Sequence, residues 1–435
     1  MKSIISKIYT VPNKDKIFNW VKLISITGGA QIIVQLIGLV SGILIIRLLP
    51  THEYGLYTLA NTMLGTMTIL ADGGISTGVM AQGGKVWQDR EKLGAVLSTG
   101  LDLRKKFAAV SLIISTPILL YLLLKQGASW VTAVLIVASL IPAFYAALSD
   151  ALLEIVPKLH QSILPLQKNQ VTVGVGRLFL SGITLFAFPW TFVAILATSI
   201  PRIYGNIKLR RIAYEYVDAD QQPNKEVRGE ILKGVKRLLP LSIYYTVSGQ
   251  ITLWLLSFFG NSTSIAQMGA LGRFSMLLGL FSSVFSNLIF PRFARLKMEK
   301  KNIFKKFLQI NVLLVLVLSV VILVFYVFQN QLLWILGKQY TNLNKEFIMM
   351  MVAGCMSLWG GTNFGLLTSR GWVMNPISGI PIGMVGIIIG ALCINLSTLL
   401  GAINYNIFLS FYSLIVAVGF FVFKMSTVKE DHQEF

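Results

Sequence analysis

Long apolar blocks, separated by short polar segments, run along almost the whole chain. A helix needs about 20 mainly apolar residues to cross a bilayer, and twelve blocks come close to that length. They are residues 23–49, 54–80, 107–124, 130–153, 171–188, 190–204, 238–259, 265–290, 311–328, 347–368, 377–396 and 399–423. Blocks of this kind exclude a transmembrane barrel, whose strands would alternate over about ten residues.

Six blocks precede a charged stretch and six follow it, so we predict an all-α integral membrane protein with twelve transmembrane helices. An even number of spans gives both halves the same orientation. Two six-helix lobes would then be related by a pseudo-two-fold axis along the membrane normal. At an offset of 214 residues, Gly55 of the first half aligns with Gly269 of the second. The predicted division is a basic N-terminus at 1–22, a lobe at 23–207, a linker at 208–237, a lobe at 238–424 and a tail at 425–435.

Charge is scarce in this chain and unevenly placed. Charged residues make up 13%, about half the share of a soluble domain, which excludes a soluble cytosolic enzyme. Of the 38 Lys and Arg, 32 fall on one set of alternating loops and 4 on the other. Since basic loops stay in the cytoplasm, we predict that both termini are cytoplasmic. The net charge of +20 would then face anionic lipid rather than nucleic acid.

Two other features are explained by packing. Cys355 and Cys393 lie in apolar blocks and predict buried thiols rather than a disulfide, while three histidines are too few for a metal cluster, so no cofactor is expected. Gly38 and Gly42 have the spacing of residues that let helices approach closely. Prolines within the blocks and the polar run 359–363 predict broken helices, either beside a central cavity or as kinks of a static bundle.

Two motifs resemble those of a known family. Residues 49–57, which read LPTHEYGLY, look like the corner between spans one and two of polysaccharide biosynthesis exporters. Residues 70–77 resemble that family's Leu, Asp, Gly and hydrophobic pattern at the end of span two, and residues 287–292 are similar to its span-eight ending. The chain departs from the family at Leu271, where Tyr is usual, and near Thr252, where Asp is common. No site residue of the second half is therefore carried over.

The family is that of the Wzx-type flippases of lipid-linked oligosaccharides, in a superfamily that also holds multidrug and toxic-compound exporters. The resemblance implies an undecaprenyl-pyrophosphate-linked repeat unit as substrate. It would move from the cytoplasmic to the outer leaflet by alternating access, for O-antigen, capsule or exopolysaccharide synthesis. The resemblance also implies a bacterial inner membrane, membrane lipids, a polysaccharide polymerase and glycosyltransferases as partners, and a coupling proton or sodium ion.

Arginine within a span indicates function, because it costs about 2.5–3.5 kcal/mol at the bilayer centre. Arg273 lies about eight residues into its predicted span and is the best candidate to line a cavity, where its guanidinium would bind phosphate bidentately. Arg177 is similarly deep from the cytoplasmic side, and Arg47 lies at the outer end of span one. For Arg273 and Arg47 the alternative is a side chain that reaches the lipid headgroups.

Three carboxylates are candidates for ion coupling or gating. Asp150 and Glu154 are four residues apart near the end of span four and so share a helix face. The alternative is that they pair with Arg177 across a short hairpin. Asp72 lies near the cytoplasmic mouth of span two, where it could instead be a solvated carboxylate that fixes the helix end beside Gly73.

Three other functions stay open at this point. A multidrug exporter would bind organic cations and favour carboxylates and aromatic rings within its spans, whereas the deep charges here are mainly arginine. A membrane glycan polymerase or ligase would need a large outer loop with catalytic groups, but the longest one, 329–346, contains no histidine. A non-transporting scaffold for polysaccharide assembly is the third. The deeper aromatic residues, such as Tyr244 and Tyr245, could stack on sugar rings or pack against lipid.

Overall fold

The chain is entirely helical in the part that the computed structural model describes, residues 14–285, 289–294, 296 and 299–427. The helices are α1 (Lys14–Leu48), α2 (Thr51–Asp72), α3 (Ile75–Lys85), α4 (Arg90–Lys125), α5 (Trp130–Leu153), α6 (Ile155–Leu159), α7 (Ile163–Ala187), α8 (Thr191–Tyr214), α9 (Lys225–Phe259), α10 (Ser262–Ser275), α11 (Leu278–Val284), α12 (Phe290–Ala294), α13 (Lys300–Val327), α14 (Gln329–Leu336), the 3₁₀ helix η3 (Lys338–Tyr340), α15 (Asn344–Ser369), α16 (Pro376–Cys393) and α17 (Leu399–Thr427). Asn287 and Leu288 of the span-eight motif and the basic residues before Lys14 lie outside the described residues.

Each predicted span falls mainly on helix, which confirms the all-α membrane fold. Within the described part of the chain, seven helices are long and apolar enough to cross a membrane: α4, α5 with α6, α7, α13, α15, α16 and α17. The other predicted spans are less uniform. α1 is apolar over Ile32–Leu48, α8 and α9 each carry charged turns at one end, and two spans are broken.

The breaks fall on spans two and eight. Span two divides at Gly73 and Gly74, whose φ angles of 50° and 97° lie in the left-handed region that glycine adopts without a steric penalty. Span eight divides after Ser275, where two residues separate the end of α10 from the start of α11. The predicted break at 359–363 is wrong, because α15 is continuous there. Two of its polar side chains donate to Asn311 Oδ1 of α13, Trp359 Nε1 at 2.7 Å and Asn363 Nδ2 at 2.9 Å.

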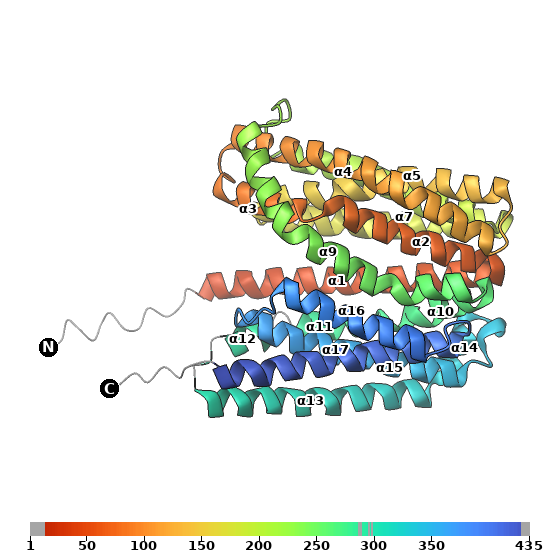
Figure 1. Cartoon of the computed structure of the whole chain (residues 1–435). Helices are drawn as coiled ribbons and strands as arrows, with labels where there is room; N and C mark the ends of the chain where they lie inside the picture. The colour runs from red at the N-terminus through yellow and green to blue at the C-terminus, as the bar shows by residue number, and fades with distance from the viewer. Residues whose placement is uncertain (1–13, 286–288, 295, 297–298, 428–435) are drawn as a thin grey trace.

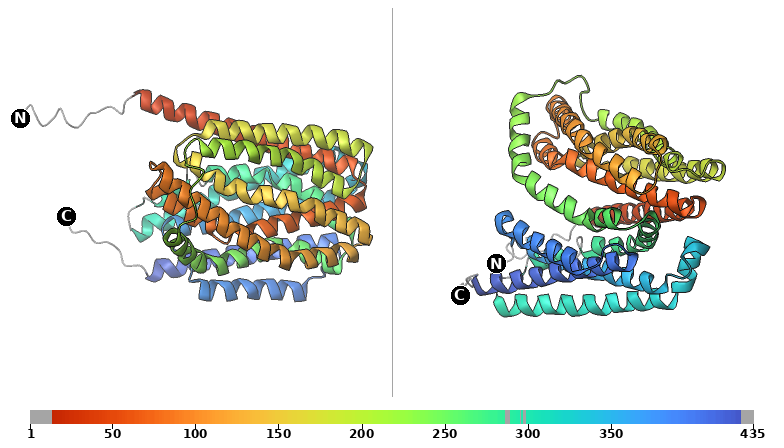
Figure 2. Two further views of the ribbon diagram at one scale, coloured as in Figure 1. Left: turned by 90° about the horizontal axis from the view of Figure 1, so that it is seen from above. Right: turned by 45° about the vertical axis from the view of Figure 1, so that its right-hand side comes forward.

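The helices form two groups, as expected for a two-lobe transporter fold. In Figure 1, α2 to α5 and α7 lie above, α11 to α17 lie below, and α1, α9 and α10 run between them. The right-hand view of Figure 2 shows the same two groups. α1 begins and α17 ends at the same end of the bundle, which is also the end at which α9 begins. We call this the basic end, since most of the Lys- and Arg-rich loops belong to it.

The predicted linker, 208–237, is largely helical. α8 continues to Tyr214 and α9 begins at Lys225, so only 215–224 connects them. The first turns of α9 pack on α3, where a side chain at Gly78 would meet Ile231 at 3.0 Å, and Ile231 is fully buried. The charged residues of this segment led to the prediction of a loop. The segment is instead an amphipathic helix, with one apolar face directed at the first half.

The two halves meet closely at the end opposite the basic end. The largest apolar cluster there joins side chains of both halves, from Tyr54 of α2 to Phe347 of α15. A side chain at Gly55 of α2 would collide with the Ser262 carbonyl of α10, and one at Gly269 of α10 would meet Thr58 of α2 at 2.5 Å. The two glycines that align in the sequence repeat therefore both lie at the contact of equivalent helices. We call this contact the seal.

Candidate functional site

A polar cavity of about 490 Å³ lies between the seal and the basic end. Its walls come from α1, α2, α5, α7 and α8 of the first half, and α10 closes it from the second. A further space of about 480 Å³ shares Asn61, Ala151 and Arg202 with it and extends to Asp72 and Arg104. We call the two together the central cavity. Its polar and charged lining residues are Ser41, Tyr57, Asn61, Thr68, Asp72, Ser76, Arg104, Asp150, Glu154, Asn169, Gln170, Arg177, Thr198, Ser199, Arg202 and Arg273.

Arg273 enters the cavity from the last turn of α10. The helix ends two residues later, at Ser275. Its Nε lies 3.5 Å from the Tyr54 hydroxyl. The prediction that Arg273 lines a cavity fits this placement.

Arg177 of α7 lines the same cavity. Its Nε is buried and has no hydrogen-bond partner in the described part of the chain. Neither Arg177 nor Arg273 forms an ion pair with a carboxylate among the described residues. An unpaired polar group without water costs about 1–3 kcal/mol, and more when charged. The pair therefore favours an anion in this cavity.

Gly42 of α1 makes room for Arg273, and Gly38 of the same helix lies beside Arg177. A side chain at Gly42 would meet Arg273 Nε at 3.2 Å, and one at Gly38 would meet Arg177 Nη2 at 3.7 Å. At Gly42, the close approach that this spacing predicts is made by the Arg273 side chain of α10. The signal was the spacing itself: residues four apart face one direction, and here that direction is the cavity.

Asp150 pairs with Arg202 rather than with Arg177. Arg202 Nε of α8 lies 3.0 Å from one carboxylate oxygen, and Asn206 donates to the other at 2.6 Å. The expected hairpin pairing with Arg177 is wrong because α5 packs along α8, which brings Arg202 to it first.

Glu154 also has a partner other than Arg177. Lys158, four residues on, lies 2.6 Å from one oxygen, and Gln170 donates to the other at 3.3 Å. Both carboxylates line the cavity, yet each already has a cation. Their role in ion coupling stays a prediction.

Asp72 forms an ion pair with Arg104, which lies between the predicted spans 54–80 and 107–124. Arg104 Nη2 lies 2.9 Å from Asp72 Oδ1, and Ser76 Oγ donates to the same oxygen at 2.6 Å. Arg104 is only 4% exposed. α4 begins at Arg90, well before its apolar block, and this early start buries an arginine that composition alone assigned to water.

Similar architectures occur among solved transporter structures. A multidrug resistance MATE family transporter of the MOP superfamily, in an inward-facing conformation, has a TM-score of 0.68 at 13% identity and covers 90% of this chain and 94% of its own. The lipid II flippase MurJ, in an inward closed conformation, has a TM-score of 0.70 at 13% identity and covers 93% and 94%. A MOP superfamily transporter from Pyrococcus furiosus, for which a reversed polarity of the binding pocket suggests a different function, has a TM-score of 0.60 at 16% identity and covers 94% and 96%.

The chain shares the fold of these MOP superfamily transporters. This finding confirms the two-lobe all-α architecture. No protein-family model matches the sequence, and a search of curated proteins finds no match.

Within the MOP fold, Arg47 lies away from the central cavity. Its Nε and Nη2 donate to the carbonyls of Ile335 and Trp334, each at 2.8 Å, and its guanidinium lies 5.2 Å from the Trp334 ring centre. These carbonyls belong to the last turn of α14, so Arg47 caps a helix of the second half. The structure therefore places Arg47 beside the seal rather than with Arg177 and Arg273.

The aromatic residues Tyr244 and Tyr245 also lie outside the central cavity. They line a mainly apolar cavity of about 400 Å³ between α9, α15, α16 and α17. A side chain at Gly383 of α16 would collide with the Tyr244 hydroxyl. Gly383 therefore lets α16 approach α9 closely.

Proposed function

We propose that this protein is a flippase that moves a polyprenyl-pyrophosphate-linked oligosaccharide between the two leaflets of a bacterial inner membrane. The observation that carries the proposal is the convergence of Arg177 and Arg273, from different halves, in one cavity without carboxylate partners among the described residues. Guanidinium groups match phosphate oxygens in a planar fork. Two of them suit the two phosphates of a pyrophosphate.

The rest of the cavity suits sugars. Serine, threonine, asparagine and glutamine side chains line it, and the buried Ser41 hydroxyl and Asn169 Oδ1 lack partners in the described structure. Such groups can exchange hydrogen bonds with sugar hydroxyls. An oligosaccharide headgroup cannot cross hydrocarbon without them, because each bare polar group costs several kcal/mol.

Transport of an organic cation is the main alternative, since a multidrug transporter shares the fold. A cation would need a free carboxylate in the cavity. Asp72, Asp150 and Glu154 are each paired with a basic side chain, which leaves the cavity positive. The polarity of the pocket also bears on function in the Pyrococcus furiosus transporter, and here it favours an anion.

The direction of transport follows from the charge pattern. The basic end would lie in the cytoplasm, with both termini and the α8–α9 connection. The seal would then close the outer side, and the central cavity would receive its substrate from the cytoplasmic leaflet. Opening the seal and closing the basic end would release the headgroup outside. A proton or sodium ion could drive the cycle through the cavity carboxylates.

The test is binding of undecaprenyl pyrophosphate to the purified full-length protein, with neutral undecaprenol as the reference. Arg273→Ala and Arg177→Ala should each weaken pyrophosphate binding by about 10- to 150-fold, the loss of one charge-assisted hydrogen bond. Arg273→Lys should restore it only in part, because a point charge lacks the fork geometry. Neither change should affect undecaprenol.

Arg211→Ala is the control, since Arg211 is an exposed arginine of α8 that does not line the cavity. In cells that lack the native gene, both cavity variants should also accumulate lipid-linked intermediates on the cytoplasmic leaflet. If both alanine variants bind undecaprenyl pyrophosphate like the parent, the proposal is wrong. Cation transport would be the better account if tetraphenylphosphonium then bound, and Asp150→Asn abolished that binding.

A further inference from the structure

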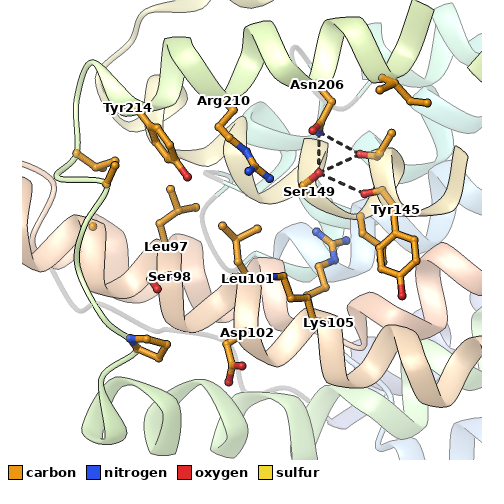
Figure 3. Close-up of a pocket in the computed structure, with 18 of the residues that line it drawn as sticks. Leu97, Ser98, Leu101, Asp102, Lys105, Tyr145, Ser149, Asn206, Arg210 and Tyr214 are labelled. Atoms are coloured by element: carbon orange, nitrogen blue, oxygen red, sulfur yellow. Dashed lines mark hydrogen bonds between the residues drawn. The ribbon is translucent and has the colours of Figure 1, made fainter. Parts of the chain in front are cut away.

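A second large hollow lies on the first half at the basic end. It has a volume of about 630 Å³ and runs between α4, α5, α8 and the segment that follows α8. In Figure 3, Lys105 and Asp102 come from α4, Ser149 and Tyr145 from α5, and Arg210 and Tyr214 from α8. We call this hollow the crevice.

Its basic side chains are poorly paired. Lys105 and Arg210 are exposed and form no ion pair with a carboxylate in the described part of the chain. Arg104 also lines the crevice, and it is shared with the central cavity. Its Nη2 is taken by Asp72, but its Nε and Nη1 are buried without a partner among the described residues. A guanidinium that is 4% exposed with two free nitrogens requires an acceptor.

The acidic side chains of the crevice do not supply that acceptor. Asp102 is occupied by Lys106 at 2.8 Å and by Arg228 at 3.9 Å. Asp218 accepts from Gln221 at 2.7 Å, and this hydrogen bond is the main reason that the pKa of its carboxyl lies below the usual value. Three basic side chains, Arg104, Lys105 and Arg210, thus line the crevice with two carboxylates, of which Asp102 already pairs with Lys106.

The position of the crevice along the bundle indicates the kind of anion. Lys105 comes two residues before the apolar block of α4, and Arg210 follows that of α8, which is the level of lipid headgroups. Toward the membrane the lining becomes apolar, with Pro142, Tyr145 and Ile203. Tyr145 is 47% exposed, so the apolar part is open to the bilayer. One end suits a phosphate and the other an acyl chain.

We propose that the crevice binds the headgroup of an anionic phospholipid of the leaflet at the basic end. Lys105 and Arg210 would hold its phosphate, and the free nitrogens of Arg104 would complete the contact. The lipid would then touch the same arginine that holds Asp72 in the central cavity. This site shares Arg104 with the central cavity, but Arg177 and Arg273, which would hold the pyrophosphate of the proposed substrate, do not line it.

The experiment measures the melting temperature of the full-length protein in detergent with increasing short-chain phosphatidylglycerol, and with phosphatidylcholine of equal chain length. We expect phosphatidylglycerol alone to raise the melting temperature in a saturable way. The double variant Lys105→Gln/Arg210→Gln should need about 10- to 100-fold more of it for the same rise. Lys208→Gln/Arg211→Gln removes the same charge from α8 positions outside the crevice and should behave as the parent.

Three outcomes would overturn the proposal. The first is an equal rise with phosphatidylcholine, which would mean that charge is not recognised. The second is an equal effect of the two double variants, which would mean that the lipid acts through overall charge. The third is an equal rise with glycerol 3-phosphate, which has the phosphate but no chains and would mark a site for soluble anions.

Discussion

At Gly42 a single missing side chain positions an arginine. A valine there would push on the Arg273 guanidinium, which lies 3.2 Å from the position of a Cβ. We expect Gly42→Val to weaken binding of undecaprenyl pyrophosphate by about tenfold, roughly the value of one displaced charged hydrogen bond, without unfolding the protein. Equilibrium binding to the purified protein measures this.

Gly29→Val is the matched control, since Gly29 lies in the same helix and nothing lies within 4 Å of its Cβ position. It should bind as the parent does. If Gly42→Val also binds normally, Gly42 does not position Arg273.

The Asp72–Arg104 pair should contribute to stability as well as to the cavity. Arg104→Met removes one partner of a largely buried pair and leaves the carboxylate uncompensated, which costs about 3–5 kcal/mol. Asp72→Asn/Arg104→Met removes both charges and should recover part of that loss. Melting temperatures in detergent give the comparison. A double variant no more stable than Arg104→Met would mean that the charge of Asp72 is not what makes the single change costly.

Position within an apolar block of the sequence predicted the two cavity arginines, but it did not predict which residues lie beside the cavity with them. Arg177 and Arg273 stand out because each interrupts an apolar block. The partner of Asp150 could not be predicted in the same way, because Arg202 belongs to a helix 52 residues away whose contact with α5 depends on packing. Arg104 was not predicted as a buried residue because it stands in one basic run with Lys105 and Lys106, and both of those side chains are exposed.

At the scale of the helices, the break between α2 and α3 depends on backbone conformation. Gly73 has a φ of 50°, and a side chain there would also meet Leu239 Cδ1 of α9 at 2.9 Å. Gly73→Ala should therefore lower the free energy of unfolding by about 1–2 kcal/mol or more, the cost of a left-handed conformation for an L residue. Thermal unfolding in detergent measures the effect.

Gly65→Ala provides a comparison of opposite sign. Gly65 lies within α2, with nothing within 4 Å of its Cβ position, so alanine should raise stability by up to about 1 kcal/mol. If the two variants melt at the same temperature, the left-handed turn does not define this helix end.

Apolar blocks were a sound guide to the helices and a poor guide to their breaks. A block shows where lipid or protein surrounds a helix, and that was enough to find α13, α15 and α17. It does not distinguish a kink from a continuous helix, because hydrogen bonds from a neighbour can satisfy polar residues in place. Proline is an equally poor guide to a break, because Pro142 and Pro240 lie inside the continuous helices α5 and α9.

For the whole molecule, the seal must open if the halves alternate. The Cβ position of Gly269 lies 3.1 Å from Thr58 Cβ, slightly below the range of about 3.5–4.5 Å that a disulfide spans. Thr58→Cys/Gly269→Cys, in a chain with Cys355 and Cys393 replaced by serine, should cross-link after a small shift. The oxidised protein should lose transport, and a reductant should restore it.

Each single cysteine variant is the control and should transport under both conditions. A fully cross-linked protein that still transports would show that α2 and α10 stay together throughout the cycle. The repeat-related glycines would then serve assembly rather than movement.

The two cavity arginines have a consequence for the energy of the cycle. They come from α7 and α10, on opposite halves, and like charges in a partly dry space repel. An empty cavity therefore pushes its own walls apart, and a doubly charged headgroup draws them together. A ligand can shift a conformational balance only through its different affinity for the two states, and here that difference is electrostatic. A neutral glycolipid of the same size would fit the cavity, but it would not offset the repulsion between the two arginines and so would not shift the conformational balance.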